Sequence, residues 1–138
     1  MNHPFNCVGI LIILVCICMS GMSVQAPENH GIVSAVLFYS PDCPFCHQMI
    51  EEILIPLKSQ FPESLQIFGI DTTTSPGSRF FQNYIDTFDV PAYRQGVPVL
   101  IVGNTALTGD EIAAQASPLI EKALFSPGKS SPVLPGLW

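Results

Sequence analysis

Two cysteines in one short stretch are the side chains best suited to chemistry in this sequence. Residues 43–46 read Cys-Pro-Phe-Cys, and His47 follows directly. Two thiols separated by two residues can exchange electrons with other disulfides, and the same spacing followed by histidine is the attachment signature of a c-type haem. The motif by itself therefore allows two kinds of chemistry, dithiol exchange and haem electron transfer.

The haem alternative requires a second axial ligand, commonly Met or His. After residue 26 the only methionine is Met49, which stands too near the motif to reach the opposite face of a haem. His30 is the only distant histidine in that part, and it lies in a linker-like stretch. The strands predicted below also differ from a small, mostly helical cytochrome c. Dithiol exchange is favoured, and haem c stays as an alternative.

The remaining cysteines also favour redox use. Three of the five lie in the N-terminal segment, so Cys43 and Cys46 are alone in the rest of the chain. A disulfide that closes so short a loop removes little chain entropy, which argues against a purely structural bridge. A zinc site needs about four Cys or His ligands. Only His30 and His47 are further candidates, so no metal is expected.

Composition narrows the class of partner. The chain has 138 residues, of which 48% are hydrophobic, and this suffices for one domain with a buried core. The formal net charge is −6, and the five basic residues are scattered along the sequence. Nucleic-acid binding needs clustered Lys and Arg. No nucleic acid is therefore expected as a partner.

An uninterrupted apolar run, Cys7–Met19, precedes the small residues SGMSVQA. This order is typical of a secretory signal peptide, although no Lys or Arg precedes the run. Cleavage after Ala26 would place Pro27 directly after the cut, where signal peptidase works poorly, and cleavage after Ser23 is a workable alternative. Retention as an anchor also fits, because Cys7–Val24 spans 18 residues, near the lower limit of about 17–25 for a membrane helix. Residues 1–26 are predicted to be a signal peptide or membrane anchor that exports the domain to the periplasm or the exterior.

The rest of the chain alternates apolar runs typical of strands with patterns typical of helices. Strands are predicted at 32–39, 65–71 and 97–102, and a short antiparallel partner follows the third within 105–109. Helices are predicted after the cysteines, at 79–88 and from 110 to about 125. Ser and Thr of the loop before the second helix are expected to cap it.

Two prolines are expected to interrupt helices. Pro56 should end or kink the first helix near Ile55, and Pro118 should break the last helix, with Ser117 capping the restart. Residues 126–138 are rich in Pro, Gly and Ser and are predicted to be a tail. The order β–α–β–α–β–β–α predicts an α/β fold in which helices flank a mixed central sheet.

Three features together resemble the thioredoxin superfamily: a strand ending FYSPDCPFC, a CxxC at a helix start, and the later stretch GVPVLIVG. The similarity covers residues 32–125 of a predicted domain at 27–125, and more narrowly the chain resembles exported bacterial thioredoxin-like domains. It implies a thioredoxin-like fold and an extracytoplasmic thiol–disulfide oxidoreductase. Its substrates would be protein thiols and disulfides, and the Cys43–Cys46 disulfide would replace any cofactor.

The resemblance also implies a substrate-binding element. It implies a cis peptide bond between Val97 and Pro98, with the proline facing the dithiol and the Val97 backbone pairing with substrate. Some domains of this kind act with vitamin K epoxide reductase-like membrane proteins, so a protein of that class is a candidate redox partner.

Physical chemistry assigns the two cysteines different roles. The thiolate is the reactive form of cysteine, and the N–H groups and positive dipole end at a helix N-terminus favour it. Cys43 is therefore predicted to attack, and the more buried Cys46 to resolve the mixed disulfide. Pro44 suits the first helical turn. Phe45 is predicted either to contact substrate or to pack on the core.

The region around the motif departs from thioredoxins at two positions. Leu37 stands where many of them carry a buried Asp that serves proton transfer, and Asp42 stands where a Trp usually precedes the motif. A carboxylate beside Cys43 should oppose its thiolate, so Asp42 and His47 are expected modulators of the dithiol. Because a fold does not fix a function, a non-catalytic binding module is a further alternative.

Overall fold

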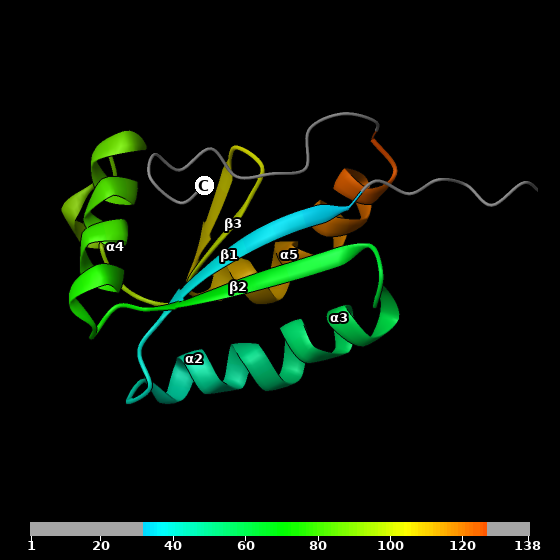
Figure 1. The fold of residues 1–138 in the computed structure, drawn as a ribbon, viewed down its shortest axis with the longest axis horizontal. Helices are drawn as coiled ribbons and strands as arrows, with labels where there is room; N and C mark the ends of the chain where they lie inside the picture. The colour runs from blue at the N-terminus through cyan, green and yellow to red at the C-terminus, as the bar shows by residue number, and fades with distance from the viewer. Residues whose placement is uncertain (1–31, 127–138) are drawn as a thin grey trace, which may run out of the picture.

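The computed structural model describes residues 32–126, which form a four-stranded mixed sheet with helices on both faces (Figure 1). The sheet order is β2–β1–β3–β4, which confirms the predicted α/β class. The predicted signal or anchor segment and the tail beyond residue 126 lie outside the described residues. Within residues 32–126, no helix has the length and apolar character needed to cross a membrane.

The elements follow the predicted order. The strands are β1 (Val33–Tyr39), β2 (Leu65–Asp71), β3 (Val99–Val102) and β4 (Thr105–Thr108). The helices are α2 (Pro44–Met49), the π-helical η1 (Ile50–Leu54), α3 (Ile55–Gln60), α4 (Ser75–Thr87), the short 3-10 turn η2 (Ala92–Arg94) and α5 (Asp110–Leu124).

Strand β1 lies in the centre of the sheet and ends at the dithiol. It runs parallel to β2, with Tyr39 opposite Asp71, and antiparallel to β3, with Phe38 opposite Val99. Strands β3 and β4 form an antiparallel hairpin. Parallel neighbours need a long crossover connection, and the crossover from β1 to β2 is the helical segment that carries the two cysteines.

The two faces of β1 belong to different apolar clusters, because successive residues of a strand point in opposite directions. Leu37 packs in a cluster that includes residues of α2, η1, α3 and α5. Phe38 packs in a second cluster with Tyr84 of α4, and their ring centroids are 5.7 Å apart. Figure 1 shows α4 on one side of the sheet, with α2, α3 and α5 on the other.

The helix after the cysteines does not end at Pro56. It continues from α2 through η1 into α3 and ends at Gln60. In η1 the N–H of Ile55 bonds to the carbonyl of Ile50, five residues earlier. Proline has no N–H, and in a regular α-turn its ring would collide with the carbonyl four residues before it. The wider π turn just ahead of Pro56 relieves this conflict and lets the chain stay helical.

The predicted break at Pro118 is wrong. Helix α5 runs from Asp110 to Leu124 with Pro118 inside it, so Ser117 does not cap a new helix. Ala116 and Ile120, on either side of the proline, are fully buried. Their burial against the sheet offsets the hydrogen bond that proline removes, which is how tertiary packing overrides local propensity.

Helix α4 begins at Ser75, earlier than the predicted Arg79. Its N-cap is Thr74, whose hydroxyl accepts the N–H of Gly77 at 3.1 Å, so the expected capping by the preceding loop is confirmed. Gly77 is buried, and a Cβ added there would collide with the backbone carbonyl of Asp71. The first turn of α4 therefore lies against the end of β2 through a position that only glycine fits.

Candidate functional site

Cys43 is the N-cap of α2 and forms a disulfide with Cys46. Its extended backbone (φ −96°, ψ 105°) lets the side chain turn back over the first helical turn, where the sulfur accepts the N–H of Cys46 at 3.1 Å. Cys43 is partly exposed, whereas Cys46 is 1% exposed. One sulfur can thus meet a partner molecule while the other stays inside the fold.

The Val97–Pro98 segment meets the disulfide from across the fold. Its peptide bond is cis, and the carbonyl oxygen of Val97 lies 4.0 Å from the sulfur of Cys43, although 54 positions separate the two residues. In the disulfide this is a contact. In the dithiol, the Cys43 S–H can donate to that carbonyl as a weak hydrogen-bond donor. Pro98 is fully buried, and its own carbonyl accepts the N–H of Gly109 at 3.2 Å.

Asp42 and His47 flank the disulfide at the surface. Both side chains are exposed. Nε2 of His47 lies 2.6 Å from the carbonyl oxygen of Pro41. A carbonyl only accepts hydrogen bonds, so Nε2 carries the proton in this contact. The ring therefore braces the turn that leads into the helix, and the N–H of Asp42 bonds to the hydroxyl of Ser40 at 3.3 Å in the same turn.

Phe45 and Leu37 are both part of the apolar cluster under the helix. The ring of Phe45 is half-buried and packs against that cluster, so it is available both to the core and to a partner. Leu37 is 3% exposed and lies among apolar side chains. It also lines an apolar groove of about 410 Å³ between the β1–β2 strands and the η1–α3 segment. The interior around Leu37 is thus apolar, in the same cluster that Phe45 and Met49 of the cysteine-bearing helix join.

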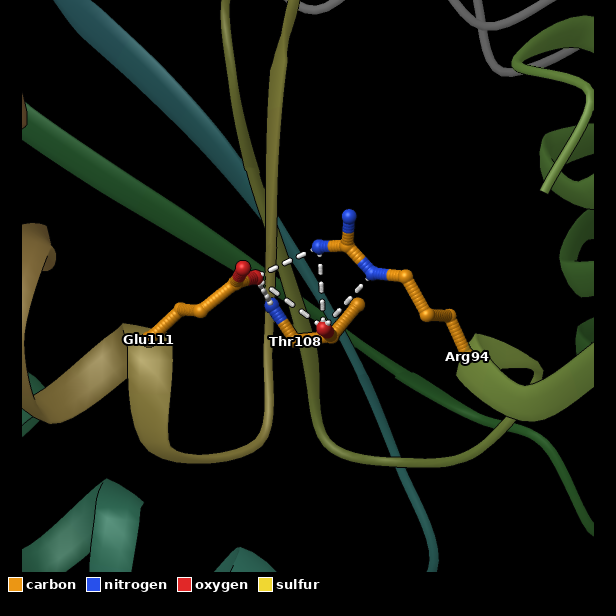
Figure 2. A network of polar contacts seen from close by, with 3 residues as sticks. All are labelled: Arg94, Thr108 and Glu111. Atoms are coloured by element: carbon orange, nitrogen blue, oxygen red, sulfur yellow. Dashed lines mark hydrogen bonds and ion pairs between the residues drawn. The ribbon is translucent and has the colours of Figure 1, made fainter. Parts of the chain in front are cut away.

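A polar network that sequence reasoning missed joins Arg94, Thr108 and Glu111 (Figure 2). Nη2 of Arg94 lies 2.6 Å from Oε2 of Glu111. The guanidinium also donates to the hydroxyl of Thr108 from Nη2 at 3.1 Å and from Nε at 3.3 Å. That hydroxyl in turn donates to Oε2 of Glu111 at 3.0 Å, and the backbone N–H of Thr108 reaches the same oxygen at 2.8 Å.

These contacts lower the pKa of Glu111 from its ordinary value. The largest cause is the backbone N–H of Thr108, and the Thr108 hydroxyl and the Arg94 charge act in the same direction. Part of the network carried a sequence signal, because Thr108-x-x-Glu111 matches the pattern in which a Glu side chain bonds back to a backbone N–H before a helix. Arg94 carried none, since its partners lie 14 and 17 positions away.

No protein family, no curated protein and no solved structure matches this chain. The small mixed sheet with flanking helices and the Cys43–Cys46 pair are compatible with a thioredoxin-like fold. Among residues 32–126, no group of three or more His, Cys, Asp and Glu side chains is placed to hold a metal ion.

Proposed function

We propose that this chain is an exported thiol–disulfide oxidoreductase that exchanges disulfides with protein substrates through Cys43 and Cys46. The observation that carries the proposal is the asymmetry of the pair. Cys43 is partly exposed and its sulfur accepts a helix N-terminal N–H, while Cys46 is buried one turn further along. An accessible, stabilised sulfur next to a sheltered one is the arrangement that attack and resolution require.

In the reducing direction, the Cys43 thiolate attacks one sulfur of a substrate disulfide. A mixed disulfide forms and one substrate thiolate leaves. The Cys46 thiolate then attacks the Cys43 sulfur, closes the Cys43–Cys46 disulfide and releases the second substrate thiolate. The protein loses two electrons and the substrate gains them, and each released thiolate takes up a proton from water. The reverse sequence oxidises a substrate dithiol and leaves the protein reduced.

Substrate would lie along the Val97–Pro98 segment. The Val97 carbonyl is already against Cys43, so an extended substrate backbone pairing there would place its own cysteine at the attacking sulfur. Phe45, whose ring is partly exposed, would give an apolar contact beside it. We further propose that the domain works in the periplasm or the exterior, and that a vitamin K epoxide reductase-like membrane protein is its redox partner.

The test of activity is reduction of insulin and reactivation of a disulfide-scrambled protein by the full chain. Cysteines 7, 16 and 18 are replaced by Ala in every variant, so that only the pair contributes thiols. Wild type should act in at least one assay, and Cys43→Ser should lose that activity while staying folded, because Ser is itself a favoured N-cap residue. An inactive wild type, or a Soret absorption band in the exported protein, contradicts the proposal.

The roles of the two cysteines are tested by trapping. Cys46→Ser keeps the attacker and removes the resolver, so it should accumulate mixed disulfides with substrate proteins. Cys43→Ser should trap few, because the remaining thiol is buried. Non-reducing gels of the two variants, followed by mass spectrometry of the trapped proteins, give the comparison. More trapping by Cys43→Ser than by Cys46→Ser would reverse the assignment.

A further inference from the structure

We propose that Arg94 is a positioning residue of the disulfide site, which acts through Thr108 and Glu111 to hold the Val97 carbonyl against Cys43. This inference rests on the proposed exchange function and adds a residue that does not touch the sulfurs. The charged network, with both partners more than a third exposed, includes Thr108, which is paired with Val99 directly after the segment that faces the disulfide.

The segment between α4 and β3 has its own internal hydrogen bonds. The N–H of Arg94 bonds to the carbonyl of Pro91 at 2.8 Å, and the N–H of Gln95 to that of Ala92 at 3.3 Å. The side-chain amide of Gln95 donates to the carbonyl of Val90 at 2.8 Å. All three bonds begin and end between residues 90 and 95. They fix the shape of the segment. Its place on the fold is held on the α4 side by the N–H of Val90, which bonds to the carbonyl of Ile85 at 3.0 Å, and by apolar packing of Val90 and Val97.

The Arg94 side chain supplies a tie to a different element. Its guanidinium reaches Thr108, the last residue of β4, and Glu111 in the first turn of α5. Thr108 is paired across the sheet with Val99, the residue directly after Pro98. The next residue, Gly109, donates its N–H to the carbonyl of Pro98. The chain before Val97 is therefore bonded, through Arg94, to the residues that join β4 and α5. The chain from Pro98 onward is bonded to the same residues.

The geometry suits arginine and no other cation. Two guanidinium nitrogens, Nε and Nη2, converge on the Thr108 hydroxyl, and Nη2 also meets Glu111. A lysine ammonium is a single point of donation on a flexible stem and cannot reproduce this fork. Because the Thr108 hydroxyl donates its hydrogen to Glu111, its lone pairs are free to accept hydrogen bonds from Arg94.

Loss of this tie should affect large and small substrates differently. A substrate peptide must lie along the Val97 backbone, so it feels any drift of the segment relative to Cys43. A small disulfide needs to reach only the Cys43 sulfur, whose stabilising N–H comes from its own helix. Arg94 is thus expected to matter for exchange with peptides and little for exchange with a small, neutral disulfide.

The experiment compares Arg94→Gln, Arg94→Lys and Glu111→Gln with a matched control, Arg79→Gln, which removes the same charge from an exposed position on α4. Each reduced full chain, with cysteines 7, 16 and 18 replaced by Ala, reacts with a neutral peptide that contains an internal disulfide and with dithiodipyridine. Arg94→Gln should slow the peptide reaction about fivefold, a change of about 1 kcal/mol in barrier, and the dithiodipyridine reaction less than about twofold.

The other variants test whether the network acts as a unit. Arg94→Lys should restore only part of the peptide rate. Glu111→Gln should slow the peptide selectively, and the Arg94→Gln/Glu111→Gln double variant should be no slower than Arg94→Gln, because both changes remove one shared contact. Hydrogen exchange gives an activity-independent readout: the amide of Gly109 should exchange faster in Arg94→Gln, while that of Leu100 in the centre of β3 stays protected.

Several results would overturn the proposal. If Arg94→Gln slowed the reactions with both substrates equally, the change would have damaged the fold in general. If it did not slow the peptide reaction, the Arg94 contacts would not position the Val97 carbonyl. Slowing by Arg79→Gln of the same size would reduce the effect to net charge. Failure of the proposed function looks different, because reduced wild type would then react with dithiodipyridine, as any accessible thiol does, but not with the peptide disulfide.

Discussion

The backbone N–H of Cys46 points at the sulfur of Cys43 and bonds to it at 3.1 Å. This contact and the N-cap position of Cys43 place the start of the helix against the attacking sulfur. We expect the Cys43 thiol of the reduced protein to have a pKa below the value of about 8.5 for a free cysteine. The pH dependence of its alkylation by iodoacetamide measures this, with Cys46→Ser as the reporter variant. A midpoint at or above 8.5 would contradict the expected role of the helix.

Asp42 should work against that effect. Its exposed carboxylate adjoins Cys43 in the chain, and a like charge disfavours the thiolate. Asp42→Asn is therefore expected to lower the pKa of the Cys43 thiol and to speed its alkylation near neutral pH. The matched control is Glu51→Gln, which removes an exposed carboxylate further along the helix. The Asp42 effect should shrink at about 1 M salt, where the screening length falls to about 3 Å; an effect insensitive to salt would point to a change in structure instead.

Glu111 should make stability depend on pH in a defined direction. The Thr108 N–H, the Thr108 hydroxyl and Arg94 lower its pKa in the folded protein. A lowered folded pKa adds stability that is complete above the unfolded value of about 4.3 and is lost as the pH falls through the folded value. Both Glu111 and Arg94 are more than a third exposed, so screening limits the gain to about 0.5–1 kcal/mol.

The measurement is urea unfolding of wild type and Glu111→Gln at pH 7 and below pH 4. Wild type should be the more stable protein at pH 7, and the difference should narrow in acid. Glu63→Gln, at an exposed turn position, serves as the control and should show no such change. A wild-type advantage that grows as the pH falls would have the wrong sign for this explanation.

Substitutions at Leu37 test how much a polar or charged side chain in the apolar interior lowers the stability of the fold. Leu37 is 3% exposed within an apolar cluster, so Leu37→Asp should lower the free energy of unfolding by about 3 kcal/mol or more. Leu37→Asn has nearly the same size and no charge. Burial raises the pKa of the introduced carboxyl, so the extra cost of Asp over Asn should be small near pH 4 and grow as the pH rises. Chemical denaturation across this range gives both numbers, and equal costs at all pH values would show that the site admits water.

Gly77 tests how closely α4 packs against β2, and Gly96, which lies outside α4, serves as the control. A Cβ at Gly77 would collide with the Asp71 carbonyl, whereas nothing lies near a Cβ at Gly96. Gly77→Ala should therefore cost about 1–3 kcal/mol, as overpacking does, and Gly96→Ala should change stability by less than about 0.5 kcal/mol. Urea midpoints of the two variants provide the comparison. Similar midpoints would mean that α4 can shift away from the end of β2.

Much of the fold could be predicted from local patterns. The bounds of β2 agree with the prediction, because an apolar run ends in a Thr- and Ser-rich loop. The start of α4 was missed because its first turn, from Ser75 to Ser78, consists of small or polar residues and shows no apolar stripe. The N-cap residue, Thr74, is of a type that commonly caps helices and could have indicated this start. Pro118 misled the prediction for α5 because the burial of its neighbours, which sustains the helix, is a property of the folded chain.

The sequence by itself determined the order and most of the bounds of the elements, and the local chemistry at the helix start. Apolar periodicity gave strands and helices, and the spacing of Cys43 and Cys46 allows their disulfide within a single turn. The tertiary structure alone decided that Val97 lies against Cys43 and that Arg94 lies against Thr108 and Glu111. These contacts join residues that are 54, 14 and 17 positions apart. They depend on strand order and register, which are set by the packing of whole elements and leave no local pattern in the chain.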